Sequence, residues 1–237
     1  MIIYLTEYWR IIEIKKIDFL FAKYVNNLYT YIYTIIKMTD NLYNERAEEV
    51  LNFAQETIKS STWEFVCEKL GTNLYKTNLP DKCDFPCYMV KTTINKSKES
   101  LVAKMWNATE QDTKDWDPKV TSWEEVDCGN NWKVCSQYNA IAPLIWSRHT
   151  VFAQVKLEKE NATYLVAYSI DHPKVTHDAS KYVMAKVHMS VYEYVDNKNN
   201  ATDVTRIALV DPCGKIPTWL VELFAGNMVN MFNKWKE

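Results

Sequence analysis

Glycine is scarce in this chain: only 4 of its 237 residues are glycines, and no two of them lie close together. A G-x-G-x-x-G turn and a phosphate-binding loop both need clustered glycines, so these nucleotide-binding motifs are excluded. Positive charge is not in excess either, since 28 Lys and Arg stand against 30 Asp and Glu. No basic field is available to hold a nucleic-acid backbone, and we expect no nucleic-acid partner.

Motifs of catalysis and metal binding are also missing. No G-x-S-x-G or H-E-x-x-H sequence occurs, and the C-x3-C pair of Cys83 and Cys87 has no matching second pair. We therefore expect no metal, no cofactor and no enzymatic activity. A core of this size needs no disulfides, and four N-x-[ST] sequons, where chance gives about two, are not a secretion signal, so we expect reduced cysteines and a cytoplasmic protein.

Residues 1–37 lack both a signal-peptide pattern and a membrane span. Their longest uncharged run, residues 24–36, is well short of the roughly 20 residues that cross a bilayer. Two interpretations stay open. This Ile-, Tyr- and Lys-rich segment is an amphipathic membrane-surface helix, or it is leader sequence upstream of a true start at Met38. We predict a domain boundary here, with an extension over 1–37 and one domain over 38–237.

The rest of the chain has the pattern of an α+β domain. Thr39 and Asp40 are good N-cap residues for a helix that ends near Ser60. A second helical segment is predicted over 98–116. Short joins between the strand-like runs favour an antiparallel sheet. Nine such runs are predicted, over residues 62–70, 73–79, 87–95, 120–127, 132–140, 148–158, 162–170, 181–195 and 202–210.

Two segments carry strong apolar patterns. A helix is predicted from Pro217 to Trp235, and its apolar residues fall inside a 120° arc at 100° per residue. Over residues 181–195, every second residue from Val183 to Val191 is apolar, as expected of an antiparallel strand with one dry face. Periodicity does not distinguish a packed core from an apolar cavity at either segment.

Several motifs then occur in the order in which they stand in a known family. They are DWDPKVTSWEEVD, SRHTVFAQV, AYSIDHPKV and, most specific, TDVTRIALVDPCGKIPTWLVE. In these motifs the chain resembles the START domains, the family named for the steroidogenic acute regulatory protein. The resemblance covers residues 46–236 and does not extend to residues 1–37.

The resemblance implies a helix-grip fold, in which a curved antiparallel sheet of about nine strands wraps around a long C-terminal helix and encloses a lipid tunnel. It implies intracellular lipid transfer by a monomer that binds one lipid and contacts membranes transiently. Joined to the apolar patterns, it predicts ten lipid-binding residues: Phe152, Gln154, Val183, Ala185, Val187, Met189, Leu220, Phe224, Met228 and Met231.

A closed tunnel must open against a bilayer to exchange lipid. The loop over residues 171–181 matches the family's mobile loop near the tunnel mouth, so we predict that this loop and the start of the terminal helix form the membrane-docking surface. Packing of Trp219 on the sheet edge is the alternative. The predicted docking residues are Lys174, Lys181, Lys215, Trp219 and Leu223.

The chain departs from the family pattern at three positions. His149 stands where the family often has Asp. Sterol-binding members carry a buried Arg and acid at the positions of Gln154 and Cys135, so this resemblance favours a phospholipid, sphingolipid or fatty-acyl ligand over a sterol. A solvent-facing Gln154 remains the alternative. A lipid sensor acting through a protein partner, and a helix-grip hydrolase, are the alternative functions.

Overall fold

The computed structural model describes the backbone of residues 2–197 and 200–237. Side chains are described for residues 24–25, 28–32, 34, 37–197, 200–217, 220 and 225–237. The chain divides into two compact units, Met1–Leu42 and Tyr43–Glu237. The first unit is helical, whereas the second contains the sheet, its helices and every site described below.

Helix α1 runs without a break over Ile2–Ser60, a length of 59 residues. The predicted helix start at Thr39 and Asp40 is therefore wrong. Neither Pro nor Gly occurs between residues 2 and 60, so nothing in the sequence ends the helix where the two capping residues stand. Among the residues described, no helix is both long and apolar enough to cross a bilayer.

The second unit is built on one large sheet, as the nine predicted runs indicate. Its strands follow the order β1-β2-β3-β10-β9-β7-β6-β5-β4, and all neighbours in this order are antiparallel. The central strands are long, so this sheet is the scaffold for everything packed on it. The bounds are β1 Glu64–Lys69, β2 Thr72–Thr77, β3 Cys87–Ile94, β4 Val120–Cys128, β5 Trp132–Asn139, β6 Ser147–Glu158, β7 Ala162–Ser169, β9 Lys186–Asn197 and β10 Ala201–Asp211.

Two predicted segments are divided in the structure. The run over 181–195 forms the short strand β8, Tyr182–Met184, and the long strand β9. Strand β8 pairs with β6 in parallel, an exception to the predicted antiparallel sheet. The helical segment over 98–116 forms α2, Lys98–Trp106, and α3, Glu110–Trp116. Ser97 and Thr109 supply the N-caps of these two helices, so each begins with its own capping residue.

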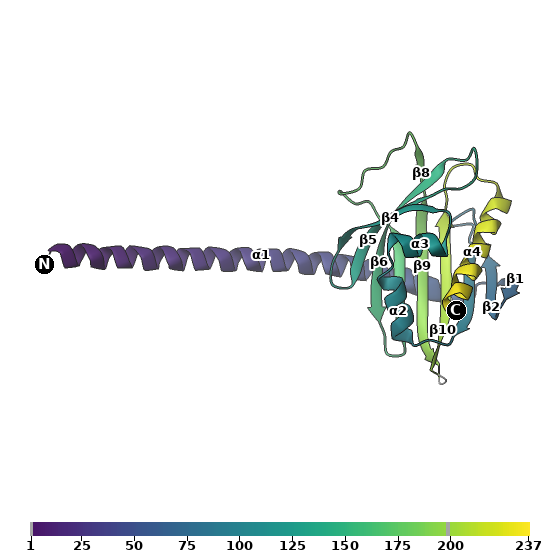
Figure 1. Ribbon diagram of the computed structural model, residues 1–237, viewed down its shortest axis with the longest axis horizontal. Coiled ribbons are helices and arrows are strands. Elements are labelled where there is room, and N and C mark those ends of the chain that lie inside the picture. Colours follow the sequence, from purple (N-terminus) through teal and green to yellow (C-terminus); the bar gives the residue numbers. More distant parts are fainter. Residues whose placement is uncertain (1, 198–199) are drawn as a thin grey trace. The chain divides into compact units, whose positions relative to one another are not determined.

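The sheet is covered on both faces. The last turns of α1 pack on one face, where Ala47, Leu51 and Ala54 join Val151 and Val166 of the strands in an apolar cluster. The opposite face carries α2, α3 and the terminal helix α4, Thr218–Lys236 (Figure 1). Burial of these two faces drives the folding of this unit.

A β-bulge changes which side of the sheet β9 presents. Leu209 of β10 pairs with Met189, but its neighbour Val210 pairs with Val187, so His188 is an extra residue on β9. Side chains alternate between faces, and one extra residue reverses that alternation. Met189 consequently belongs to the α1 side of the sheet, whereas Val187 belongs to the α4 side.

Helix α4 is held firmly at its C-terminal end. Phe232 and Trp235 are fully buried, and Trp116 meets Trp235 edge to face with ring centroids 5.3 Å apart. Thr72 donates a 2.8 Å hydrogen bond to the Asn233 side-chain oxygen, which joins the helix to strand β2. These contacts confirm the helix-grip fold that the resemblance implies.

Candidate functional site

A cavity of about 320 Å³ lies between the sheet and the helices α2, α3 and α4. Its wall is mostly apolar, although several polar side chains reach into it. The apolar part is made by residues of the sheet and of α4, among them Phe152, Ala167, Ala185, Val187, Val210 and Met231. The α4 side of the sheet therefore contains a cavity. Sequence periodicity alone did not distinguish such a cavity from a packed core.

The structure brings five of the ten predicted lipid-binding residues to this cavity, namely Phe152, Gln154, Ala185, Val187 and Met231. The remaining five are placed elsewhere or are not described. Met189 packs on the α1 face because of the bulge, and Met228 packs against the cluster beneath α4. Val183 is half-buried in β8, Leu220 packs against Ile141, and the Phe224 side chain lies outside the described residues.

Gln154 is the polar group that sequence comparison singled out. Its side chain is only 6% exposed and lines the cavity, so the alternative that it faces solvent is excluded. Among the described residues, none forms a hydrogen bond with the Gln154 amide in this structure. Cys135 is fully buried two strand positions away on β5, opposite Phe152, and burial raises the pKa of its thiol to about 12. Both groups are therefore neutral at physiological pH.

A buried arginine ties the cavity wall to the turn before α4. Arg148 is 4% exposed, and its guanidinium donates to the backbone oxygens of Trp146, of Pro212 at 2.6 Å and of Cys213 at 2.8 Å. Burial lowers the pKa of Arg148. The guanidinium nevertheless remains charged, because its pKa stays far above physiological pH. All three nitrogens are occupied, so Arg148 serves the structure of this turn.

Sequence reasoning missed a second arginine in the cavity. Arg206, in the middle of β10, lines the cavity, and its guanidinium carbon lies 4.8 Å from the centre of the Tyr192 ring. Its Nε atom is buried and has no hydrogen-bond partner. The available signal was an arginine within the apolar run TDVTRIALV, where a charged side chain on the inner face of a strand is unusual.

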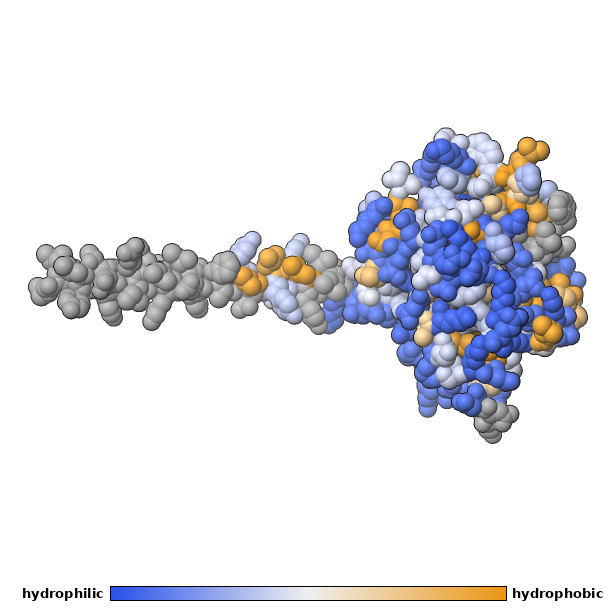
Figure 2. All heavy atoms as spheres, in the orientation of Figure 1, coloured by the Kyte–Doolittle hydropathy of each residue, from blue (hydrophilic) through white to orange (hydrophobic). Residues whose placement is uncertain are grey.

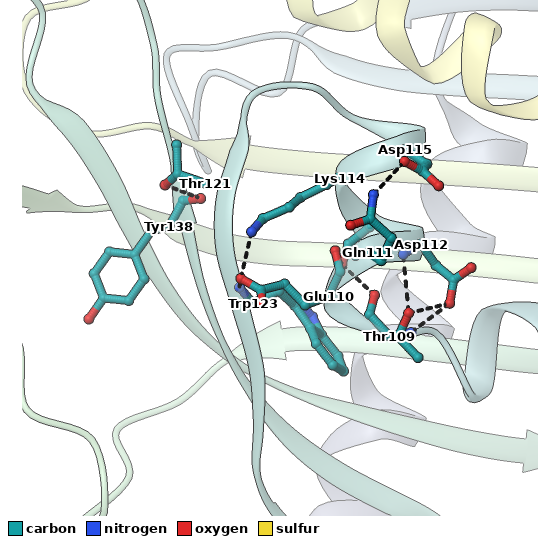
Figure 3. Close-up of polar contacts among 10 residues, drawn as sticks. Thr109, Glu110, Gln111, Asp112, Lys114, Asp115, Thr121, Trp123 and Tyr138 are labelled. Carbon is teal, nitrogen blue, oxygen red and sulfur yellow. Dashed lines mark hydrogen bonds and ion pairs between the residues drawn. The ribbon is translucent and has the colours of Figure 1, made fainter.

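Helix α3 closes the cavity edge beside β4, and its own side chains fix it there (Figure 3). Thr109 and Asp112 form a reciprocal capping box at its N-terminus. Glu110 accepts from Lys114 at 2.9 Å, and the same carboxylate oxygen lies 3.4 Å from the Trp123 backbone nitrogen on β4. These bonds orient the helix so that its other side, including Trp116, borders the cavity.

Two of the predicted docking lysines form ion pairs at the surface. Lys174 forms a 2.9 Å ion pair with Asp127, and Lys181 forms a 3.1 Å ion pair with Asp178. Residues 171–181 contribute no side chain to the described wall of the cavity. Lys215 is exposed, and the side chains of Trp219 and Leu223 lie outside the described residues.

An exposed apolar loop also stands beside the cavity. Between β5 and β6, Leu144 is fully exposed and Trp146 is 55% exposed. Ile141 and Ile145 of the same loop pack against Leu220 of α4. Figure 2 shows apolar residues gathered at the end of the domain from which α4 starts. Exposed apolar side chains that lie together can mark a contact surface.

Three side chains on the other face of the sheet could hold a metal ion. The ligand atoms of Cys83, His188 and Asp211 all lie within 4.8 Å of one another. Sequence spacing could not reveal this group, because its members come from three separate segments. Burial, together with the nearby Asp211 carboxylate, raises the pKa of the Cys83 thiol. Metal binding at this group would therefore require the Cys83 thiol to lose its proton against this shift.

Comparison with known proteins identifies the family to which this sequence and this fold belong. The model of the START domain matches residues 42–237. No curated protein matches the sequence significantly. Among solved structures, human StAR-related lipid transfer protein 5 is 16% identical, with a TM-score of 0.70 over 83% of this chain and 95% of that one.

Two further human structures are similar in fold. STARD10 is 16% identical, with a TM-score of 0.65 over 80% of this chain and 77% of that one. The lipid transfer and protein localization domain of StarD13 is also 16% identical, with a TM-score of 0.63 over 84% and 96%. Likenesses at this identity concern the fold, whereas the family match covers most of the sequence. The chain therefore belongs to the START domain family.

Proposed function

We propose that this protein binds one lipid in the cavity between the sheet and α4 and carries it between membranes. The observation that carries the proposal is the cavity itself, about 320 Å³ in volume and mostly apolar. That volume is at the low end of small-molecule sites and suits a hydrocarbon chain. Membership of the START family and likeness to StAR-related lipid transfer proteins support lipid binding in general.

Gln154 of the cavity wall and the buried Cys135 near it favour a phospholipid, sphingolipid or fatty-acyl lipid over a sterol. Gln154 and Cys135 stand where the resemblance places a charged pair in sterol-binding members. Here both groups are neutral, and the Gln154 amide has no hydrogen-bond partner among the described residues. An amide offers one hydrogen bond of about 1 kcal/mol to an ester or hydroxyl group of the lipid.

The contact with the membrane is assigned to the apolar loop and the start of α4. Leu144 and Trp146 expose apolar surface that water solvates poorly and a bilayer interface accepts. Ile141 packs on Leu220, so insertion of this loop into the interface would act directly on the helix that covers the cavity. Lys215 adds a positive charge at the helix start, worth roughly 1 kcal/mol near anionic lipid.

This function needs no chemical reaction, and a single copy of the protein is enough to perform it. We propose a monomeric cytoplasmic carrier whose working domain is residues 38–237, with residues 1–37 as an extension. The self-contained unit Tyr43–Glu237 supports this division. Burial of the lipid's apolar surface supplies the binding free energy, at about 25 cal/mol per Å² before the costs of association.

Transfer of a fluorescent phospholipid between donor and acceptor vesicles tests the proposal. We expect the wild-type protein to move many lipid molecules per protein molecule. Trp146→Ala should slow transfer several-fold at an unchanged melting temperature. Phe65→Ala is the matched control, because Phe65 is also exposed, at 56%, but lies on the edge strand β1.

Two outcomes would contradict the proposal. Binding without turnover identifies a lipid sensor, and the absence of bound lipid after incubation with vesicles excludes a carrier. Equal slowing by Trp146→Ala and Phe65→Ala shows that the apolar loop has no special part in docking.

A further inference from the structure

Among the described residues, Arg206 is the one charged group of the cavity wall that has neither a hydrogen-bond partner nor an ion-pair partner. It stands at the middle of β10, opposite Tyr192 on β9 and Val90 on β3. Both cross-strand neighbours are uncharged, and Val90 is fully buried. The residue is therefore held in an apolar part of the sheet.

The guanidinium lacks its usual partners. Among the described residues, no carboxylate forms an ion pair with Arg206, and its buried Nε donates to no acceptor. Its contact with the Tyr192 ring, at 4.8 Å, is a cation–π interaction and supplies no acceptor in the plane of the guanidinium. The Arg206 side chain as a whole is half-buried, so water only partly solvates its charge.

Neighbouring groups do not supply the missing negative charge. Burial raises the pKa values of Tyr192 and Tyr194, so both phenols stay neutral. Asp117 also lines the cavity, but its carboxylate accepts from the Lys119 backbone at 3.0 Å and forms no ion pair with Arg206. The cavity therefore holds an excess of positive charge at this point.

Arg148 shows what a satisfied arginine looks like in the same cavity. All of its nitrogens donate to backbone oxygens of Trp146, Pro212 and Cys213. Arg206 has none of these bonds, although both residues line the wall. A cation left unpaired in a low-dielectric site is unfavourable unless something else binds to it.

We propose that Arg206 binds the oxyanion of an acidic lipid, a carboxylate or a phosphate, inside the cavity. The proposal rests on the lipid-binding function proposed above and assigns the chemical class of its ligand. An oxyanion matches the planar fork of the guanidinium and can accept two of its hydrogen bonds. The acyl chain would then lie along the apolar wall of Ala167, Ala185, Val187 and Met231.

Arg206→Met tests this assignment, because Met fills a similar space without a charge. Purified protein is incubated with phosphatidylcholine vesicles containing oleate, oleyl alcohol or phosphatidic acid, and bound lipid is identified by native mass spectrometry. Oleate and oleyl alcohol have the same chain and differ in the carboxylate. The wild type should prefer oleate or phosphatidic acid over oleyl alcohol. The variant should bind the preferred acidic lipid about 10- to 100-fold more weakly, as expected for lost charge-assisted hydrogen bonds.

Controls separate this loss from misfolding. Arg46→Met removes an exposed arginine from the same unit and should leave lipid selection unchanged. Arg206→Lys should retain part of the preference, because it keeps the charge but not the fork. Without lipid, Arg206→Met should unfold at the same or a higher temperature, since it removes a half-buried charge that has no ion-pair partner among the described residues.

The outcomes distinguish this inference from the general function. A wild-type protein that takes up no lipid from any vesicle refutes the proposed function. The role of Arg206 is refuted, and the general function is not, if the wild type binds lipid and the Arg206→Met variant prefers oleate and phosphatidic acid as strongly as the wild type does. Loss of oleate binding identifies a carboxylate ligand, whereas loss of phosphatidic acid binding identifies a phosphate.

Discussion

Replacing Arg148 by Met removes the buried cation that joins β6 to the turn before α4. Its guanidinium donates to three backbone oxygens, those of Trp146, Pro212 and Cys213. These carbonyls lose their donor together, because one side chain serves all three. The turn itself depends on this support, since Cys213 and Gly214 both adopt positive φ angles, of 52° and 68°.

The magnitude follows from the number and the exposure of the lost bonds. A buried polar group left unsatisfied costs about 1–3 kcal/mol. Gly214 is exposed and Cys213 is half-buried, so water can reach part of the turn and replace some of the lost bonds. We expect the free energy of unfolding to fall by about 2–4 kcal/mol. For a unit of this size, the melting temperature should fall by roughly 4–16 °C.

Urea unfolding followed by circular dichroism measures this loss. Arg148→Lys should recover only part of it, because an ammonium group cannot reach three carbonyls with the geometry of a guanidinium. Arg46→Met is the control: this exposed arginine pairs with Glu49 three residues later, and its loss should cost less than about 0.5 kcal/mol. A loss below about 1 kcal/mol for Arg148→Met would refute the reasoning.

Three further predictions concern the cavity wall, pH and the first residues. Ala185→Trp should abolish lipid uptake at a cost of about 1–3 kcal/mol, and undiminished extraction of lipid from vesicles would show that Ala185 lies outside the ligand's path. Burial and His177 lower the pKa of His149, so the unfolded chain binds more protons than the folded chain below about pH 6.5. The free energy of unfolding should therefore fall as pH falls from 6.5, and His149→Gln should flatten this slope in urea titrations. Residues 38–237 alone should unfold at the denaturant midpoint of the full chain and should transfer lipid at the same rate as the full chain. A lower midpoint for the shortened chain would make the extension part of the fold.

The sheet and the terminal helix could be predicted because their signals are local. Pro217 stands directly before α4, and turn residues bound nearly every strand. The motif TDVTRIALVDPCGKIPTWLVE then fixed the topology through its resemblance to a family. The start of α1 was predicted wrongly. Thr39 and Asp40 are common N-cap residues, but they can also lie inside a helix when no residue before them ends it.

The composition of the cavity could be predicted only in part. Gln154 was found because a motif placed it, whereas Arg206 was missed because a strand pattern does not say which of its faces becomes hollow. The position of α4 determines this, because the helix packs against some of the inward-facing residues and leaves others lining the cavity. The exposed Leu144 was missed for the opposite reason, since an apolar residue in an apolar run ordinarily predicts burial.

The extra residue at His188 has a consequence for reading β9 by position. On the N-terminal side of His188, odd-numbered residues such as Ala185 and Val187 border the cavity, whereas beyond it Met189 and Val191 support the core under α1. Substitutions at odd-numbered positions before His188 should thus affect ligand selection, whereas those at odd-numbered positions after it should affect stability. Alignment to a relative without the inserted residue would exchange the two roles on one side of the bulge, so that positional equivalence holds only on the other side.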